Sequence, residues 1–307
     1  ITEIIFVSAS KEKQIDVVLV IDDKHLVDWH ADNMTRNPHH YASYWRYARR
    51  SVPSDVHEAS VKLQPSQLMQ RVQEWGPGIW YHPYVTLSDA SDTYKYGVVS
   101  TSALVDDLLH WTHLYLAGRL HKPVLTVHEP NVILQHALDV NHRAAVAVTA
   151  LLLANNVRVP ITCREFYAHL SGVSYRGDIR MGWAESPDKI SRLVGDGNAF
   201  DAIYRPILRQ WGLLNHAEQV VVPRDSSAVL IDNVPVPLRS AALASVPRTS
   251  AAALTSSTAV SLDTPLHAQL SRVVARSSRI QTVKGLLTAG PARSVAYSLH
   301  KIRKRIF

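Results

Sequence analysis

Two apolar runs rich in isoleucine and valine, residues 4–7 and 15–21, constrain the fold most strongly, because they open the chain and only a short polar connection separates them. Runs of this length and composition are typical of buried strands. Residues 78–87 and 94–100 predict a second pair of strands. Since helical patterns separate and follow the two pairs, we expect an α+β protein.

Helical periodicity accounts for much of the rest of the first half of the chain. Residues 26–36 have a helical pattern that Pro38 ends. Residues 102–117 carry one apolar stripe, and Gly118 fits the end of a helix there. Residues 131–155 predict a long and mostly buried helix.

A different pattern begins after residue 160. Residues 162–165, Thr-Cys-Arg-Glu, form a capping-box sequence at the start of an apolar helix. Two more short helices are predicted at residues 188–194 and 199–211, and a strand-like segment follows at residues 219–223. Several short helices and a small hairpin in so short a span suit a compact winged-helix-like module.

Composition limits the class of protein. A chain of 307 residues is expected to hold two domains and an appendage, and 46% apolar with 19% charged residues exclude wholesale disorder. The longest run of small and apolar residues, 144–154, is well short of the roughly 20 residues that span a bilayer. The single cysteine, Cys163, excludes an internal disulfide framework and a multi-cysteine zinc site.

Positive charge is concentrated at the C-terminal end. The net charge is +7, yet residues 264–307 hold nine Lys and Arg and no carboxylate, so the rest of the chain carries −2. Such a segment is attracted to phosphates, on nucleic acid or on an anionic membrane. Residues 294–307 regain a helical period with an apolar face that suits a bilayer. Residues 239–261, rich in Ser, Ala and Thr, are expected to be loop or linker.

Asp16 interrupts the second apolar run and is the first candidate for a chemical role. Its position leaves two interpretations open: a strand-end aspartate bonded to backbone, or a carboxylate that holds Mg²⁺ against a nucleoside triphosphate. Asp22 lies roughly 20 Å farther along a straight strand, so the two carboxylates cannot share one ion. Asp22 and Asp23 are expected to cap the following helix instead.

Trp29, His30, Asn33 and Tyr41 lie on or near one face of the next predicted helix. Their indole, imidazole, amide and phenol groups could line a pocket for a base or a ribose. Periodicity alone favours a half-buried helix surface over such a pocket.

Cations on a short loop form another candidate group. Arg119, His121 and Lys122 lie close together just before a strand-like segment. Side chains fixed in this way suit a triphosphate or a phosphatidate headgroup. A basic helix end favoured by the helix dipole explains one such cation more readily than three. Farther on, Asp178 lies between two arginines, the second of which is Arg180, a pattern also expected of a surface turn with a local ion pair.

Long motifs also follow one another along the chain in a fixed order. They are Ile15-Asp16 to Asp22-Asp23, Asp28-Trp29-His30 with Asn33, Asn37-Pro38-His39-His40-Tyr41, and residues 95–100, 106–111, 114–124, 174–181, 284–290 and 297–301. In this order the motifs resemble the mitochondrial phosphatidate cytidylyltransferases, also known as translocator assembly and maintenance proteins. The resemblance runs nearly end to end and weakens between about residues 220 and 283.

The resemblance implies a nucleotidyltransferase-fold domain at residues 1–155, a winged-helix-like domain at 156–223, and a linker with a basic membrane-associating C-terminal helix at 224–307. It implies an enzyme that makes CDP-diacylglycerol and pyrophosphate from CTP and phosphatidic acid with Mg²⁺, feeding cardiolipin synthesis. The expected location is the matrix side of the mitochondrial inner membrane, as a peripheral protein. Nucleic acid is not an expected partner, and a homo-oligomer is left open.

The resemblance also implies roles for particular residues. Asp16 is expected to be the metal ligand, with Arg119 and Lys122 binding phosphates. Asp178 and Arg180 are expected to complete the catalytic site from the second domain. The expected nucleotide-binding side chains are Trp29, His30, Asn33, Tyr41, Lys95 and His121.

Two features depart from the family pattern. The family has a Gly-Ser-Gly phosphate loop after its first strand, whereas residues 6–11 here contain no glycine. A loop missing from the sequence is favoured over a lost loop, and the start at Ile1 likewise suggests that a preceding segment was removed or left out. Because Val17 and Val18 follow Asp16, an Asp-x-Asp pair is not evident and a second metal ligand must come from elsewhere.

Two other functions remain as alternatives. One is a nucleotidyltransferase that acts on RNA or protein. The other is a non-enzymatic winged-helix protein that binds nucleic acid through its basic tail, in which case duplex binding would be tight and sensitive to salt.

Overall fold

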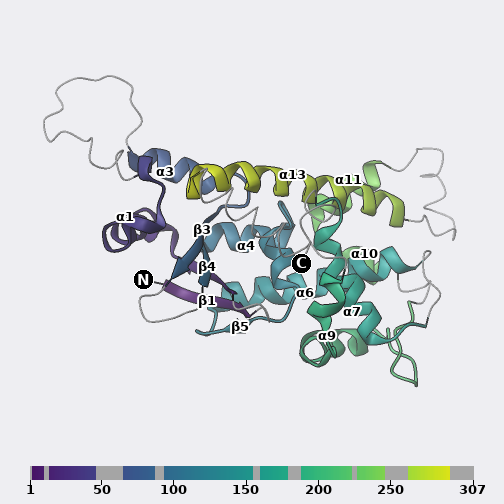
Figure 1. Cartoon of the computed structure of the whole chain (residues 1–307). Helices are drawn as coiled ribbons and strands as arrows, with labels where there is room; N and C mark the ends of the chain where they lie inside the picture. Colours follow the sequence, from purple (N-terminus) through teal and green to yellow (C-terminus); the bar gives the residue numbers. More distant parts are fainter. Residues whose placement is uncertain are drawn as a thin grey trace, which may run out of the picture. The chain divides into compact units, whose positions relative to one another are not determined.

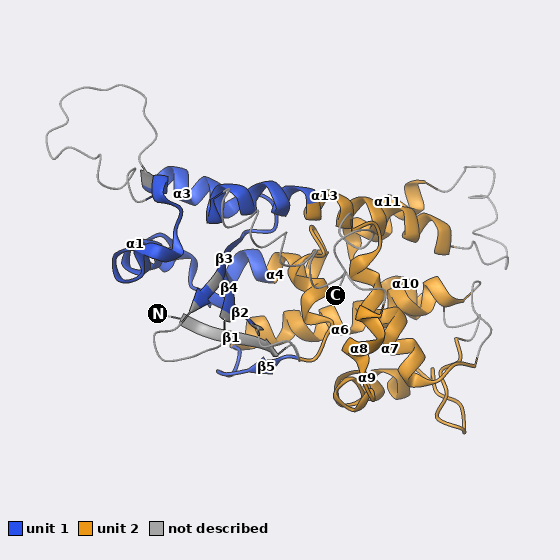
Figure 2. Ribbon diagram, viewed as in Figure 1, with its two compact units in different colours: residues 1–104, 124–130, 279–307 blue, residues 105–123, 131–278 orange. Residues whose placement is uncertain are grey.

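A computed structural model describes residues 2–9, 14–45, 65–86, 93–154, 160–178, 188–222, 227–245 and 262–290. As predicted, the chain is an α+β protein; its described part is mostly helical with a small sheet (Figure 1). Its contacts divide it into two compact units (Figure 2): unit 1 comprises residues 1–104, 124–130 and 279–307, and unit 2 comprises residues 105–123 and 131–278. No helix in the described ranges is both long and apolar enough to cross a membrane.

Unit 1 is built on a five-stranded sheet made of β1 (Thr2–Ala9), β2 (Gln14–Ile21), β3 (Ile79–Thr86), β4 (Thr93–Ser100) and β5 (Leu125–Thr126). The strand order is β3-β4-β2-β1-β5. β2 and β4 run parallel, and the other neighbouring pairs are antiparallel. The four strands predicted in the first hundred residues are confirmed as β1 to β4. A parallel pair requires a long crossover connection, and the described residues between β2 and β4 include β3 and two longer helices.

These helices are α1 (Leu26–Arg36) and α3 (Pro65–Glu74). Asp22 accepts a hydrogen bond from the main-chain nitrogen of Lys24 at 3.1 Å and so caps the short helix η1 (Asp23–His25), which leads directly into α1. Asp23, also predicted as a cap, lies within η1, and the N-cap position of α1 itself is His25. α1 ends before Pro38, as predicted, and the short helix η2 (Pro38–His40) follows. The core beside these helices comprises Met34, Tyr41, Ala42, Trp45, Met69 and Trp80.

Helix α13 (Asp263–Ala289) contributes its C-terminal part to unit 1. The side chains of Tyr44 and Trp45 both donate to the main-chain oxygen of Leu287, Trp45 at 2.8 Å, and so satisfy a carbonyl that has no partner within the helix. Gly290 follows with φ 85°, the left-handed conformation that commonly ends a helix. The sequence pattern does not predict this helix, because its buried face mixes leucine and valine with Ser277, Gln281, Lys284 and Thr288.

Lys284, one of the basic residues of the C-terminal segment, is fully buried. Its Nζ donates to the main-chain oxygens of Gln73 at 2.6 Å and Trp75 at 3.0 Å, at the C-terminal end of α3. The helix dipole favours a cation there, while burial lowers the pKa of Lys284 to about 7. One of the nine cations of this segment is therefore engaged inside the protein rather than available to a phosphate.

Unit 2 is helical in its described part. Its helices are the end of α4 (Thr101–His110), α5 (Leu116–Leu120), α6 (Val132–Leu153), α7 (Cys163–Gly172), η3 (Val173–Tyr175), α8 (Lys189–Val194), α9 (Asn198–Gln210), α10 (Ser227–Asp232), α11 (Val236–Ala244) and the first part of α13. The long buried helix predicted after residue 131 is confirmed as α6, whose cap is Asn131. The two short helices predicted after residue 188 are confirmed as α8 and α9.

Two local predictions for unit 2 are corrected. The predicted strand at residues 219–223 is reduced to isolated bridges from Val220 to Ile161 and Leu214, because only single residue pairs meet there. Residues 239–244, predicted as loop, instead form the second part of α11, in which Leu238 and Ala242 are buried. Residues 246–261 and the helix predicted at 294–307 lie outside the described residues.

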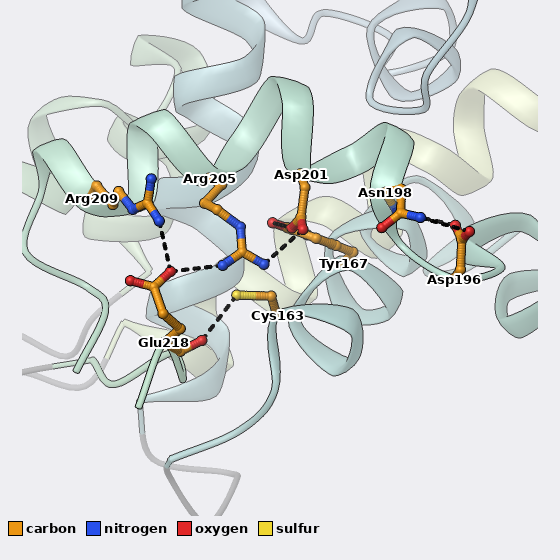
Figure 3. A network of polar contacts seen from close by, with 8 residues as sticks. All are labelled: Cys163, Tyr167, Asp196, Asn198, Asp201, Arg205, Arg209 and Glu218. Carbon is orange, nitrogen blue, oxygen red and sulfur yellow. Dashed lines mark hydrogen bonds and ion pairs between the residues drawn. The ribbon is translucent and has the colours of Figure 1, made fainter. Parts of the chain in front are cut away.

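A polar network joins α7 to α9 (Figure 3). The predicted capping box opens α7 at Thr162 and is confirmed. Arg205 of α9 lies between two carboxylates, with nitrogens 2.7 Å from Asp201 and 2.7 Å from Glu218. Tyr167 of α7 donates its hydroxyl to Asp201 at 2.6 Å. These bonds fix the helices that precede and follow α8.

Candidate active site

Asp16 lies on β2 and is half-buried. In the sheet register it is level with Ser8 on β1 and with Lys95 on β4. Residues level with one another on parallel strands point to the same face of the sheet, so Asp16 and Lys95 share a face. The Lys95 ammonium lies 4.3 Å from the centre of the Tyr81 ring, an attractive cation–π contact. A carboxylate and a cation, both predicted from the sequence, are therefore neighbours.

A cluster of aromatic and histidine side chains covers the opposite face of the same sheet. Asn33 donates to the hydroxyls of Tyr41 at 3.1 Å and Tyr96 at 2.9 Å. The Tyr96 ring stacks on His82 at 4.5 Å, and Trp29 packs edge-on against Tyr96 at 6.5 Å. Since Tyr96 is one position along from Lys95, its side chain points to the other face. The structure thus brings Trp29, His30, Asn33 and Tyr41 together, but not with Asp16.

His30 shows how tightly this cluster is packed. Its Nδ1 lies 2.9 Å from the Tyr41 hydroxyl and its Nε2 lies 3.0 Å from Oε1 of Gln73, so both ring nitrogens are used. Burial lowers the pKa of His30 to about 4, which keeps the ring neutral at neutral pH. Burial likewise raises the pKa of Tyr41. These contacts match the half-buried helix surface that periodicity favoured.

The Asp107 side chain stabilises the turn that precedes Arg119 and Lys122 in unit 2. The helix predicted at residues 102–117 ends instead at His110, and Trp111 and Leu114 have φ of 53° and 49°. The Asp107 carboxylate accepts five main-chain hydrogen bonds of 2.8–3.0 Å, from the nitrogens of residues 113–117. The carboxylate stabilises the turn, because it accepts hydrogen bonds from amides that a continuous helix would have bonded internally.

The short helix α5 that follows the turn carries Arg119 and leads to Lys122. The predicted end at Gly118 is wrong, because Gly118 lies inside α5. A Cβ at that position would approach the Ser174 Cβ to 2.2 Å, so this close contact requires glycine. The Lys122 ammonium donates to the Gly118 carbonyl at 2.5 Å and to the Ser174 hydroxyl at 2.9 Å.

Three cations surround the phenol of Tyr175, the residue after Ser174. Lys122 and Lys189 place their ammonium groups 4.6 and 4.7 Å from the Tyr175 ring centre. Burial lowers the pKa of Lys122 to about 8, Tyr175 opposes that shift, and Arg119 and Lys189 reinforce it. Although burial raises the pKa of Tyr175, these three cations outweigh it and lower the pKa overall. Such a group is suited to bind a phosphate, whose charge would relieve the repulsion.

The remaining predicted site residues differ in accessibility. His121 is fully buried, packs on Trp111 at 5.0 Å and has its Nε2 3.2 Å from Oδ1 of Asn141. Burial, with Lys122 and His142 nearby, lowers its pKa well below the usual range. Asp178 is buried, and its main-chain nitrogen donates to the Tyr175 carbonyl at 3.1 Å. Arg180 lies outside the described residues.

Within the described ranges, no three His, Cys, Asp or Glu side chains are grouped so that they could hold a metal ion. Mg²⁺, however, commonly uses one or two protein carboxylates and takes its other ligands from water and substrate phosphates. A single half-buried carboxylate such as Asp16 fits a magnesium ion shared with a nucleotide.

Three residues that shape this group of side chains were not predicted from the sequence: Asp107, Tyr175 and Lys189. Asp107 and Tyr175 lie within the ordered motifs at residues 106–111 and 174–181, but their contacts are to main-chain amides and to ammonium groups, which sequence spacing does not reveal. Lys189 lies at the start of α8, where a lysine has no distinguishing pattern.

Known proteins resemble this chain over nearly its whole length. The family described as "Phosphatidate cytidylyltransferase, mitochondrial" matches residues 5–304. Proteins named "Phosphatidate cytidylyltransferase, mitochondrial" are 31% identical in Danio rerio, covering 95% of this chain and 83% of their own length, and 31% identical in Drosophila melanogaster, covering 94% and 84%. The Mus musculus protein of that name is 30% identical, covering 97% and 85%. The chain therefore belongs to the mitochondrial phosphatidate cytidylyltransferase family.

Proposed function

We propose that this protein transfers the cytidylyl group of CTP to phosphatidic acid and releases CDP-diacylglycerol and pyrophosphate. The observation that supports this most is the group of cations around Tyr175, in a chain whose family match extends from residue 5 to residue 304. Both substrates and the pyrophosphate product are polyanions, so an enzyme for this reaction needs fixed cations. The product would feed cardiolipin synthesis in the mitochondrion.

The chemistry is an in-line displacement at the α-phosphorus of CTP. An oxygen of the phosphatidate phosphate forms the new bond to this phosphorus, and the bond to the bridging oxygen of the β-phosphate breaks. Pyrophosphate leaves with that electron pair. No side chain needs to act as a nucleophile, so catalysis depends on positioning and on neutralising charge.

Lys122, Arg119 and Lys189 are the proposed phosphate-binding side chains. With a pKa of about 8, Lys122 is mostly protonated at neutral pH and can donate charge-assisted hydrogen bonds to phosphate oxygens. Ser174 and Tyr175 hold and orient the ammonium groups through the contacts described above. Asp178 and Arg180 remain proposed contributors on the strength of the family motif alone.

Asp16 is the proposed magnesium ligand, together with phosphate oxygens of the nucleotide. When bound, the ion would neutralise charge on the phosphates. Lys95, level with Asp16 in the sheet, would keep a second cation on the same face. Among the expected nucleotide-binding residues, Trp29 and Asn33 are half-buried, whereas His30, Tyr41 and His121 are buried and are better explained by packing.

The architecture that accompanies this proposal is a nucleotidyltransferase-fold domain at residues 1–155 and a winged-helix-like domain at residues 156–223. Residues 224–307 would include the membrane-associating helix at 294–307. The proposed location is the matrix side of the inner membrane, with the protein bound peripherally at the surface that contains its lipid substrate.

The test is pyrophosphate release by the purified full-length chain with CTP, Mg²⁺ and phosphatidic acid dispersed in detergent. Release should require all three and should match CDP-diacylglycerol formed. Asp16→Asn should abolish it, while Lys24→Gln, which changes an exposed cation near β2, should not. Release that continues when RNA replaces the lipid, or CDP-diacylglycerol formation that survives in Asp16→Asn, would contradict the proposal.

A further inference from the structure

The exposed face of α13 carries three arginines, and the helix holds one carboxylate, Asp263 in its first turn. Arg272, Arg276 and Arg279 follow one another at spacings of four and three, so they lie on one face, and all three are exposed. Asp263 is the last carboxylate of the whole sequence. Within the described part of the chain, none of the three guanidinium groups forms an ion pair.

The same face continues as an apolar surface. Val283, Leu286 and Leu287 extend the arginine stripe toward the C-terminal end of α13, and their side chains are 48%, 42% and 43% exposed. Two aromatic residues of unit 1 adjoin this end. Tyr44, 41% exposed, donates to the Leu287 carbonyl, and Trp75, 39% exposed, accepts from Lys284 through its main-chain oxygen.

This combination of groups matches the interfacial zone of a bilayer. Arginines bind lipid phosphates, aliphatic side chains enter the acyl boundary, and Trp and Tyr prefer the level of the headgroups. A nucleic acid would engage the arginines but would leave the exposed valine and leucines in water. An anionic lipid surface satisfies both parts of the face.

We propose that this exposed face of α13 docks the protein on an anionic lipid bilayer. It is a contact separate from the predicted helix at residues 294–307. The inference rests on the proposed function only in the expectation that the substrate lies in a bilayer. The docking face comprises Arg272, Arg276, Arg279, Val283, Leu286 and Leu287.

The test is co-sedimentation of the full-length chain with vesicles of phosphatidylcholine alone or with added phosphatidylglycerol. The triple variant R272Q/R276Q/R279Q should lower the partition coefficient on anionic vesicles at least about tenfold, since each basic residue near such a surface adds to the electrostatic attraction. The control R36Q/R192Q/R209Q removes three exposed arginines elsewhere and the same net charge. It should change the partition far less.

A second variant examines the apolar part. V283S/L286S should weaken binding to anionic vesicles, and the remaining binding should become more sensitive to salt. Equal losses in the two arginine triples would overturn the inference, because net charge alone would then explain binding. So would unchanged binding of V283S/L286S, or a wild-type chain that binds RNA but no vesicles.

An activity assay separates this inference from the proposed function. With short-chain phosphatidic acid dissolved below its critical micelle concentration, R272Q/R276Q/R279Q should turn over CTP at the same rate as the wild type. With phosphatidic acid embedded in vesicles, its KM should rise. If no variant or wild-type protein turns over CTP, but the arginine triples still differ in vesicle binding, the docking face stands and the proposed reaction fails.

Discussion

Opposing electrostatic effects bring the pKa of Lys122 close to neutral pH. Burial of its ammonium group disfavours the charged form, and the nearby cations Arg119 and Lys189 lower the pKa further. The Tyr175 side chain acts in the opposite direction and raises the pKa. The result is a pKa of about 8 in place of about 10.5. A phosphate that arrives among these groups would favour the charged form again, so substrate binding and protonation are linked.

This linkage predicts a pH limit on the use of CTP. Because Lys122 loses its proton as the pH rises through about 8, kcat/KM for CTP should fall above that pH. Lys122→Arg should retain activity at higher pH, since a guanidinium stays protonated. The measurement is kcat/KM for CTP from pH 6.5 to 9.5 in both proteins, values that bracket the pKa. An identical alkaline limb in Lys122→Arg would exclude Lys122 as its source.

The burial of Lys284 predicts that the stability of the protein depends on pH. Its pKa of about 7 in the folded chain lies below its ordinary value, so between these values the unfolded chain binds more protons. The unfolding free energy of the wild type should therefore rise relative to Lys284→Met as the pH increases from about 7, by at most about 1.4 kcal/mol per pH unit. Urea unfolding at several pH values measures the difference. A pH-independent difference would mean that Lys284 is not buried as a titrating group.

At the scale of elements, the turn between α4 and α5 depends on one carboxylate. Five main-chain N–H groups converge on Asp107, and the turn determines where α5 begins and hence where Arg119 and Lys122 lie. Leaving buried donors without an acceptor costs about 1–3 kcal/mol for each group fully deprived. Asp107 is thus a positioning residue for the proposed phosphate-binding loop.

Asp107→Ala should lower the unfolding free energy by about 3 kcal/mol or more. Asp107→Asn keeps one acceptor oxygen and should fold better, but with a higher KM for CTP and a smaller change in kcat. Asp106→Asn is the matched control, because Asp106 is exposed and, among the described residues, its side chain bonds His110 and Thr112 alone. Urea unfolding and steady-state kinetics give both readouts. Equal stability of the Asp106 and Asp107 variants would contradict this role.

The same turn explains where sequence patterns stop being informative about elements. The apolar stripe through residues 104–115 is genuine, but a tertiary contact from Asp107 breaks the helix that periodicity predicts. In α13 the reverse occurs, because buried hydrogen-bonding side chains such as Gln281 and Lys284 hide the helix from hydropathy. The strands and α1, α6, α8 and α9 were predictable because their burial is mainly apolar and local.

At the scale of the whole molecule, the sheet divides the predicted site residues by face. Asp16, Trp29 and His30 are close in the sequence and belong to one unit. Along β4, however, side chains alternate between the two faces of the sheet, so Lys95 and Tyr96 lie on opposite faces. Asp16 shares the face of Lys95, whereas Trp29, Asn33 and His40 gather around Tyr96. Linear spacing cannot reveal this division, because it depends on which strands pair and in what register.

The proposed reaction depends above all on the cations around Tyr175 binding the phosphates of CTP, and titration calorimetry tests this directly. The wild-type chain should bind CTP at least about tenfold more tightly than CMP in the presence of Mg²⁺, since charge-assisted hydrogen bonds to the β- and γ-phosphates are lost with CMP. In the double variant K122Q/K189Q this preference should disappear while CMP affinity stays unchanged. A double variant that keeps the full preference for CTP would contradict the account.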